Sequence, residues 1–481
     1  MQQPPPLPKP PTPTPTPPTP TPPVEPVAVS RSAAALAFDA ATLTISGSGF
    51  DAASPQANVV VLGNGLSPGA VVVAATATQL TVSLPASSPT PTPARSTGPL
   101  TAVVTVASRG SGGVSSGAPV QVATVLLPLL NWRGAGASGD GSRLFLAANA
   151  NGTVWRSLDG GVSFSPTTAP IRNWQVRFSS SSSSFFFFCF FFFHLLVSHL
   201  LITPNPTPPP PSTTKKQTNK KSVSADATGT NVAAAAYGDA LYLSSDGGAS
   251  FRALSGSGLP ASANWGSVSI SSADGGATVA AAVQGGGGLW VSRDTGASFQ
   301  LVAGGGVPTA ADWRSVAVSA DGSKIVGVVR SGDIWRSTNG GTTMSAVGGA
   351  GGAPAPAAWR YVCSSATGQS LAAAASGGAI WVSRDSGTSW SQAGPTAPAV
   401  ASWSGCALSA DGLRLAATAN NDNIFLSADG GTTTGGQTGG APAATDWYSI
   451  AGSASGQKLI AGIFFGNVWV SSDAGVSWEI R

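Results

Sequence analysis

The chain has 481 residues and a formal net charge of +4; 9% of its residues are charged, and it contains 61 Gly, 38 Pro and 3 Cys. Coiled coils and helical bundles need abundant charged residues, and an ordinary soluble protein has about 25%, so long helical assemblies are excluded. Three Cys exclude a dense disulfide framework. The abundant Gly and Pro favour a β protein with many tight turns.

Residues 1–27 form a Pro/Thr-rich arm with the core PTPTPTPPTPTPP. Proline fixes φ and lacks an N–H, so we expect a disordered, extended spacer outside any sheet. Thr-Pro alternation also suits O-glycosylation of a secreted protein. Met1 leads directly into Gln-Gln-Pro without an apolar signal segment. The expectation is therefore either that the protein is not secreted or that its true N-terminus lies upstream.

Residues 28–125 alternate short β-prone runs with turn residues, which predicts a small antiparallel sandwich. The first run, LTISGSGF, contains Gly47, Gly49 and Phe50, and V-x-V and A-x-V-T-V strands follow it. This pattern resembles the IPT/TIG family of immunoglobulin-like domains. The resemblance covers about 100 residues and implies an Ig-like β-sandwich.

Residues 131–481 repeat a unit of the type WRSVAVSADGSKIVGVVRSGDIWRSTNGG. Seven copies align on a leading Trp: Trp132, Trp174, Trp265, Trp313, Trp359, Trp403 and Trp447. A period of about 45 residues with short strands is typical of a β-propeller, and the copies predict seven blades. The leading Trp and a second aromatic in the strand before each turn motif are expected to pack between blades rather than to bind sugars.

A turn motif, S-x-D-x-G-x-[ST]-[WF], recurs within these repeats and resembles the BNR/Asp-box of sialidases, sortilin-like receptors and photosystem II assembly factor-like propellers. We expect a structural role, with the Asp bonding its own turn and the Gly permitting positive φ. Isolated carboxylates make poor calcium sites. The predicted structural residues are Ser157, Asp159, Gly161, Ser244, Asp246, Gly248, Ser292, Asp294, Gly296, Ser383, Asp385, Gly387, Ser427, Asp429, Gly431, Ser471, Asp473 and Gly475. The copy that begins at Ser337 has Asn339 in place of Asp.

Residues 178–221 interrupt the repeats with a Phe/Ser/Pro/Lys-rich insert. Its apolar run 185–202 has the length of a membrane span, and a disordered natural insertion is a second interpretation. A retained intron is favoured, because excision that joins Arg177 to Ser222 leaves one normal repeat period. Four Lys of the insert carry the whole formal +4, so the net charge gives no argument for nucleic acid or an anionic membrane.

Catalytic residues do not stand out. Sialidases use an Arg triad, a Tyr nucleophile paired with Glu and an acidic proton donor, whereas Glu25 and Glu479 are the two Glu of this chain and neither suits a propeller centre. Arginines such as Arg156, Arg293, Arg336 and Arg384 recur at repeat positions and are interpreted as solvated blade surface. Both His lie in the insert, which excludes a Ser-His-Asp triad. No metal or cofactor motif is present.

Cys363 and Cys406 follow their leading Trp by four and three residues, so we expect them to point to opposite faces and to remain buried free thiols, with a disulfide as the less favoured alternative. The sequence predicts a monomeric, non-catalytic binding or scaffold protein of the cell surface, cell wall or extracellular matrix. Its partner is expected to be a protein or a glycan. An intracellular or organellar assembly factor is the alternative, and a carbohydrate-active enzyme is a distant third. Segments between an Asp box and the next leading Trp, such as 348–358 and 435–445, are the expected partner surface.

Overall fold

A computed structural model describes residues 26–37, 40–63, 70–84, 97–107, 114–128, 130–149, 153–169, 222–347, 349, 352–394, 397–398, 401–433, 435–436 and 439–481. Most of the Pro-rich arm, the whole insert 178–221 and Trp174 lie outside these residues. Among the described residues the one helix is the short η1 (Pro55–Ala57), and none is long and apolar enough to cross a membrane. The chain divides into two compact units, one formed by Met1–Ala34, Ala40–Ala86 and Leu100–Ala123, the other by Ala35–Asp39, Ser87–Pro99 and Thr124–Arg481.

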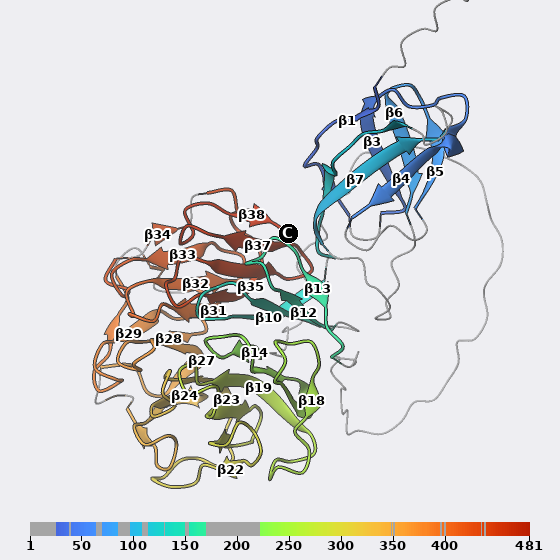
Figure 1. Cartoon of the computed structure of the whole chain (residues 1–481). Helices are drawn as coiled ribbons and strands as arrows, with labels where there is room; N and C mark the ends of the chain where they lie inside the picture. The colour runs from blue at the N-terminus through green and yellow to red at the C-terminus, as the bar shows by residue number, and fades with distance from the viewer. Residues whose placement is uncertain are drawn as a thin grey trace, which may run out of the picture. The chain divides into compact units, whose positions relative to one another are not determined.

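Two sheets, drawn in blue and cyan in Figure 1, occupy the N-terminal part. One is ordered β1 (Ala28–Val29), β3 (Thr42–Ser48), β6 (Gln79–Ser83) and β5 (Val71–Ala75); the other is β2 (Ala35–Leu36), β9 (Val120–Val125), β7 (Gly98–Val106) and β4 (Asn58–Leu62), with β8 (Val114–Ser115) beside β7. Alternate residues of β7 are buried, as a half-solvated strand requires.

The glycines of LTISGSGF have two separate structural reasons. A Cβ on Gly47 would lie 2.0 Å from the carbonyl oxygen of Ala28, because β1 and β3 approach closely there. Gly49 has φ +76°, a conformation that L side chains rarely adopt. Both glycines therefore fix the path of the chain around β3.

The second unit consists of antiparallel four-stranded groups in chain order. The first groups are β10 (Asn131–Ala137), β11 (Leu144–Asn149), β12 (Val154–Ser157) and β13 (Ser165–Pro166); β14 (Ser222–Ala225), β15 (Val232–Ala235), β17 (Leu241–Ser244) and β18 (Arg252–Ala253); and β19 (Ala263–Ile270), β20 (Val279–Val283), β21 (Leu289–Ser292) and β22 (Gln300–Leu301). The next are β23 (Trp313–Val318), β24 (Ile325–Gly332), β25 (Ile334–Ser337) and β26 (Ser345–Ala346); and β27 (Ala357–Ser364), β28 (Leu371–Ala375), β29 (Ile380–Ser383) and β30 (Ser391–Gln392). The last are β31 (Trp403–Leu408), β32 (Leu415–Ala419), β33 (Ile424–Ser427) and β34 (Gly435–Gly436); and β35 (Trp447–Gly452), β36 (Leu459–Ile463), β37 (Val468–Ser471) and β38 (Glu479–Ile480). The short β16 (Tyr237–Asp239) pairs with β19.

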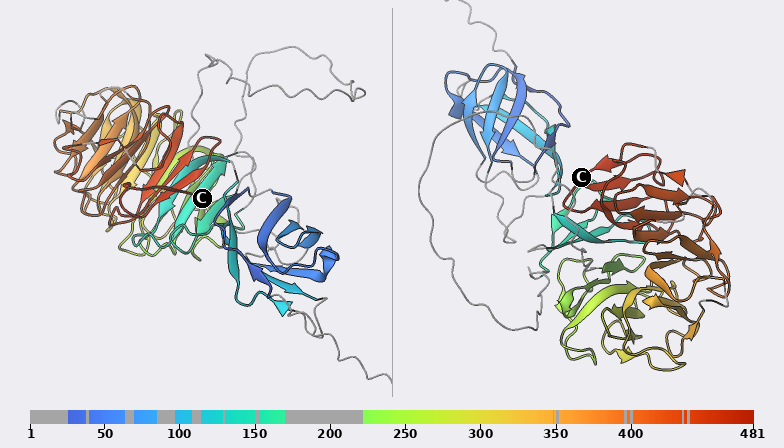
Figure 2. Two further views of the ribbon diagram at one scale, coloured as in Figure 1. Left: turned by 90° about the horizontal axis from the view of Figure 1, so that it is seen from above. Right: turned by 180° about the vertical axis from the view of Figure 1, so that it is seen from behind.

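The innermost strands of these groups form a closed circle. Each contacts the next in the order β10, β14, β19, β23, β27, β31 and β35, and β35 contacts β10 again. Figures 1 and 2 show the groups following one another from teal to red until the last lies beside the first. A closed circle of radially arranged antiparallel sheets is a β-propeller, and each group is called a blade below.

Large and small residues alternate between strands, which allows the blades to stack near the axis. The described leading Trp side chains are fully buried: Trp132, Trp265, Trp313, Trp359, Trp403 and Trp447. The second strands are rich in Ala and are buried on both faces, as in β28 and β32. At Gly327 of β24, a Cβ would lie 2.8 Å from the Trp313 ring. The repeat therefore needs small residues in the second strand to make room for the indole.

A circle of backbone hydrogen bonds joins all the blades at one end of the central channel. In each blade, an N–H in the turn after the innermost strand donates to the carbonyl of the corresponding turn in the next blade, at N–O distances of 2.7–3.3 Å. The circle runs through Gly139, Ala227, Ser272, Ala320, Ala366, Ala410 and Ala454, and Ala454 donates back to Gly139. The recurring small residue of the S-A-D-G turns thus lies where neighbouring turns touch.

The last blade completes itself with its own outer strand. β38 pairs with β37, and within the described part of the chain the sheet of the last blade consists of its own strands β35 to β38. The first and last blades are instead joined by packing of Trp132 with Ile460 and Val470, by the bridge between Leu130 and Gly466, and by a hydrogen bond from Arg481 Nε to the Gly161 carbonyl.

The register of β14 revises the sequence alignment of the second repeat. Val232 faces Ala225 and Ile325 faces Val318, so Asp226 lies at the position of Ser319 rather than of Asp321. The hydroxyl and the carboxylate have exchanged positions in this turn. Thr228 Oγ1 donates to Asp226, whereas in the fourth blade Ser319 Oγ donates to Asp321. In this register Ser222 matches Ser315, which lies two residues after a leading Trp.

Candidate functional site: the channel mouth

The innermost strands carry a recurrent irregularity directly after the leading Trp. The pairing with the second strand shifts by one residue there, which leaves one extra residue as a β-bulge. A bulge re-aims the side chain that it carries. The bulged residues are Arg133, Gly266, Arg314, Arg360, Ser404 and Tyr448. They lie at the end of the channel opposite the hydrogen-bonded circle, and we call this end the channel mouth.

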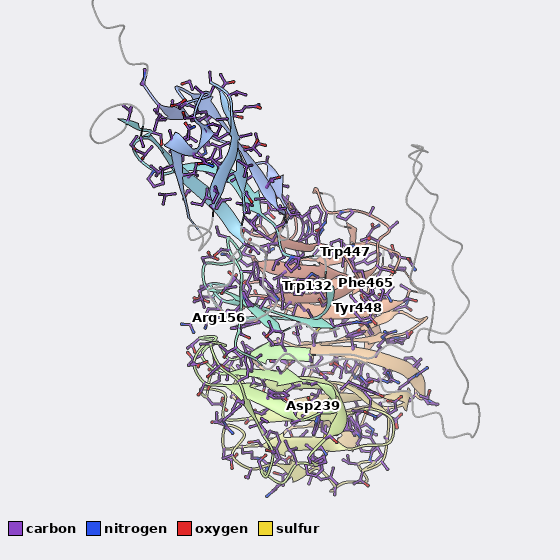
Figure 3. The ribbon with its side chains drawn as sticks, turned by 90° about the vertical axis from the view of Figure 1, so that its right-hand side faces the viewer. Trp132, Arg156, Asp239, Trp447, Tyr448 and Phe465 are labelled. Atoms are coloured by element: carbon purple, nitrogen blue, oxygen red, sulfur yellow. The ribbon has the colours of Figure 1, made fainter. Side chains whose placement is uncertain are left out.

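Arg133 lies over two aromatic rings of the last blade. Its Cζ is 4.1 Å from the Tyr448 ring centroid and 4.8 Å from that of Phe464. Tyr448 and Phe464 are themselves 5.5 Å apart, and Phe465 packs edge-on against Phe464 at 4.6 Å. Figure 3 labels Tyr448 and Phe465, together with the buried Trp132 and Trp447 of the first and last blades. Cation–π contacts of this kind hold the guanidinium in place, and the Tyr448 side chain also hydrogen-bonds it.

Arg360 is a second cation near Tyr448, and it also lies near Tyr361. Its Cζ is 5.7 Å from the ring centroid of Tyr361. Burial acts to lower the pKa of Arg360, but the neighbouring Tyr361 and Tyr448 outweigh burial and the net pKa is raised. At Arg133 burial dominates and lowers the pKa, although an arginine stays protonated at any ordinary pH. Burial raises the pKa of Tyr361 to about 12, so this phenol is neutral at physiological pH.

Arg314 is held by an ion pair. Its Nη2 lies 2.5 Å from Asp312 Oδ2, and its Nη1 donates to Gln284 Oε1 at 3.4 Å. The Gln284 side chain fills the space that a larger residue at position 266 would occupy: a Cβ on Gly266 would lie 2.2 Å from Gln284 Nε2. Gly266 is therefore what admits Gln284 to the channel mouth.

Gln284 Nε2 and Ser449 Oγ are among the buried side-chain atoms at this end that have no hydrogen-bond partner among the described residues. Both side chains are strongly buried, with exposed fractions of 5% for Gln284 and 6% for Ser449. A buried polar group without a partner costs roughly 1–3 kcal/mol, unless a ligand or water satisfies it. Ser449 also lines the channel cavity described below, where an occupant could satisfy its hydroxyl.

The channel holds a cavity of about 250 Å³ between the innermost strands. Its wall is built mainly from small and polar residues, including Ser222, Ser267, Ser315 and Ser449. Among its described lining residues the one formally charged side chain is Arg133. The cavity therefore presents positive charge and hydroxyl groups, and the chemistry it favours is recognition of an anion or a polar group.

The Asp-box residues predicted from the sequence form separate turns and do not converge on a site. In each of the six copies, Ser Oγ donates to Asp Oδ1 at 2.7–2.9 Å and accepts the Gly N–H at 2.8 Å. The six Gly have φ between +75° and +94°. Within the described part of the chain, no group of three or more His, Cys, Asp or Glu side chains is placed to bind a metal ion.

The recurring arginines of the blade surface also bond the next blade: Arg384 is exposed, as expected, whereas Arg156 and Arg336 are half-buried. Arg156 Nη1 donates to the Gly247 carbonyl at 3.0 Å, and Arg336 Nη1 to that of Ser386 at 3.1 Å. Each of these carbonyls belongs to the Asp-box turn of the next blade. Arg384 repeats the contact with Asp429 at 2.9 Å. Their role is to join neighbouring blades.

The arginines of the channel mouth were missed in the sequence. One signal was present: the dipeptide Trp-Arg at three leading positions, 132–133, 313–314 and 359–360. Of the predicted partner segments 348–358 and 435–445, several positions lie outside the described residues.

No protein-family model matches the chain, and no curated protein sequence matches it. Several solved β-propellers are similar in structure. A YCF48 structure bound to a D1 peptide has 13% identity and a TM-score of 0.46, and the match covers 72% of this chain and 95% of that one. The Cps50 (Swd1) propeller domain of Myceliophteria thermophila has 12% identity, a TM-score of 0.48, and coverage of 71% and 97%. The GH74 xyloglucanase of Xanthomonas campestris has 14% identity, a TM-score of 0.38, and coverage of 80% and 68%. Likenesses at this level carry no functional assignment.

Proposed function

We propose that the chain is a non-catalytic binding protein, in which a seven-bladed Asp-box propeller follows an IPT/TIG-like sandwich and its channel mouth binds an acidic segment of a protein partner. The observation that carries this proposal is the grouping of Arg133 and Arg360 around Tyr448 at the channel mouth. Guanidinium groups held by aromatic rings are suited to bidentate bonding of carboxylates.

The dimensions of the cavity favour a peptide segment over a folded domain. About 250 Å³ admits one or two side chains. Outside it, Phe465 exposes 63% of its surface and offers an apolar contact beside the cations. The buried Ser449 hydroxyl and Gln284 amide supply additional hydrogen-bonding groups for the same ligand. A segment with an acidic residue next to an apolar one fits this combination.

The absence of catalysis is part of the proposal. A tyrosine nucleophile is most reactive as a phenolate, and the raised pKa of Tyr361, about 12, opposes its formation. The described lining of the cavity supplies no carboxylate to act as a general base or acid. Both features support binding rather than glycoside hydrolysis.

We propose two biological settings, which one experiment distinguishes. A YCF48 propeller is bound to a D1 peptide, and a comparable peptide ligand here would suit an intracellular or organellar assembly factor. A cell-surface, cell-wall or matrix protein is the second setting. Fluorescent fusions of the full chain distinguish the two, since the first setting predicts signal inside the cell or an organelle and the second predicts signal outside the plasma membrane.

The binding proposal is tested by fluorescence anisotropy with a labelled Glu-rich 12-residue peptide, its Gln counterpart and a labelled oligogalacturonate. We expect the Glu-rich peptide to bind, and the Gln peptide to bind at least about 10-fold more weakly, because charge-assisted bonds contribute about 1.5–3 kcal/mol. Arg133→Ala and Arg360→Ala should each weaken binding by a similar factor. Arg252→Ala, on the exposed strand β18, is the matched control and should have no effect.

Equal affinity for the Glu and Gln peptides, or wild-type affinity of both arginine variants, would refute the proposal. Tighter binding of the oligogalacturonate than of the acidic peptide would replace the protein partner by a glycan.

A further inference from the structure

Two thiols from neighbouring blades meet inside the channel. Cys363 lies on β27 and Cys406 on β31, and these innermost strands contact each other. Both side chains are half-buried, line the channel cavity and pack against the same hydrophobic cluster. After burial, the neighbouring Cys406 thiol contributes to raising the pKa of Cys363, and Cys363 Sγ lies 3.8 Å from the Ala372 carbonyl oxygen.

The expectation that the two residues point to opposite faces of their own strands explains why they meet. Neighbouring blades of a propeller stack with one face of a sheet against the opposite face of the next. Cys363, four residues after its Trp, therefore faces the following blade, and Cys406, three residues after its Trp, faces the preceding one. Opposite directions, which seemed to disfavour a disulfide, bring the sulfur atoms together.

The repeat itself does not require either thiol. The position of Cys363 is occupied by Ser269 on β19, whose Oγ accepts the N–H of Val318 in the next blade at 3.1 Å, and by Ala317 on β23. The position of Cys406 is occupied by Val316 and Ile450. Hydroxyl, methyl and branched side chains thus satisfy the fold at the equivalent positions of other blades. Both cysteines occur at one junction between blades, in the same cluster and along the same cavity.

We propose that Cys363 and Cys406 are a reversible disulfide site that cross-links two blades at the channel wall and is reached by small oxidants through the channel. A peroxide is the oxidant: one thiolate attacks a peroxide oxygen and becomes a sulfenic acid with loss of hydroxide, and the second thiol displaces water from that sulfur. The net change joins two thiols by an S–S bond and reduces one hydrogen peroxide to two waters. A dithiol reductant reverses it.

The test uses the full chain with Cys189→Ser, which leaves Cys363 and Cys406 as the two thiols. The protein is treated with hydrogen peroxide at pH 8.5, because burial raises the pKa of the Cys363 thiol and slows its reaction at neutral pH. It is then denatured, alkylated with N-ethylmaleimide and weighed intact. We expect a mass loss of about 2 Da with no alkylation, and two alkyl additions after dithiothreitol. Thermal unfolding should shift upward by about 5 °C in the oxidised form.

Cys363→Ser and Cys406→Val, each the residue that the repeat uses elsewhere, are the matched controls. Neither should lose 2 Da or gain thermal stability on oxidation. Two alkylated thiols after peroxide treatment would overturn the proposal. Addition of oxygen to one sulfur without cross-linking would overturn it as well, as would a disulfide between two chains.

Discussion

Asp294 illustrates how an Asp-box carboxylate is used. It accepts the Ser298 hydroxyl, the Ser298 N–H and the Ser292 hydroxyl, and these bonds, with that of the Ser298 hydroxyl the largest contribution, lower its pKa from 3.8 to about 2. At Asp429 the N–H of Thr433 is the largest contribution to a similar shift. Each carboxylate stabilises its own turn, which leaves it no role at the channel mouth.

The lowered pKa values predict acid sensitivity. A carboxyl with a folded-state pKa below its unfolded value stabilises the protein fully above about pH 4, and this contribution is lost as the pH falls from about 4 through about 2. We expect the thermal midpoint of the wild type to fall in this window, and that of Asp294→Asn/Asp429→Asn to fall less.

The natural Asn339 turn is the precedent for this variant. Its amide oxygen accepts the Ser337 hydroxyl at 2.9 Å and the Thr343 N–H at 3.0 Å, so the amide keeps the turn. Thermal unfolding followed by circular dichroism at pH 7, 4, 3 and 2.5 measures the effect. An equal fall for the variant and the wild type would show that these carboxylates do not set the acid limit.

Residue-scale prediction from the sequence succeeded where the interacting residues are neighbours in the chain. Ser292, Asp294 and Gly296 are contiguous, so the motif alone specifies their bonding. Arg133 and Arg360 are 227 positions apart, and the fold brings them around one tyrosine. No local pattern encodes that convergence, so the channel mouth could not be predicted from the sequence, whereas the Asp-box turns are specified by contiguous residues.

At the scale of elements, the bulge after each leading Trp and the hairpin between second and third strands shape the channel mouth. The hairpin of the last blade places Phe465 at φ +49°, with 63% of its surface exposed. The corresponding hairpins use Gly377 at +69° and Asn421 at +57°, residues suited to this region. Period-two patterns predict strands, but neither a bulge nor a strained aromatic follows from them.

Phe465→Asn should therefore stabilise the protein, because Asn tolerates the left-handed conformation better than Phe. We expect an increase of about 1 kcal/mol in the free energy of unfolding. Urea denaturation measures it, with Phe464→Asn as the control, which should destabilise by removing ring contacts with Tyr448 and Arg133. Unchanged or reduced stability of the Phe465 variant would indicate that its ring makes compensating contacts. In the same variant, weaker binding of the acidic peptide would show that the strained ring serves the ligand.

At the scale of the molecule, the sequence period predicted a ring of repeats but not how the ring closes. The junction between first and last blades uses the same kinds of contact as the others, namely a buried Trp, a backbone bridge and a hydrogen bond between turns. A closed ring lets each blade support both neighbours. How the circle closes depends on residues about 330 positions apart, such as Leu130 and Gly466, whose pairing no repeat alignment contains.

Because the ring of blades is closed, we expect the junction between the first and last blades to contribute as much to stability as a junction between two consecutive blades. Trp132→Ala and Trp313→Ala should each lower the free energy of unfolding by about 3–5 kcal/mol, because each removes a fully buried indole. Urea denaturation monitored by fluorescence compares them directly. A much smaller loss for Trp132→Ala would mean that the first blade separates from the last before the rest unfolds.

The circle of hydrogen bonds between the turns gives the channel two chemically unequal ends. Every N–H in that circle points the same way around the axis and donates to the carbonyl of the neighbouring turn. Peptide dipoles arranged head to tail in a closed loop have no net dipole moment. That end cannot act as the N-terminus of a helix does toward an anion. The opposite end carries the bulged residues, among them Arg133, Arg314 and Arg360. The binding proposal therefore places the acidic ligand at that end of the channel alone, and the two ends of the propeller differ in chemistry.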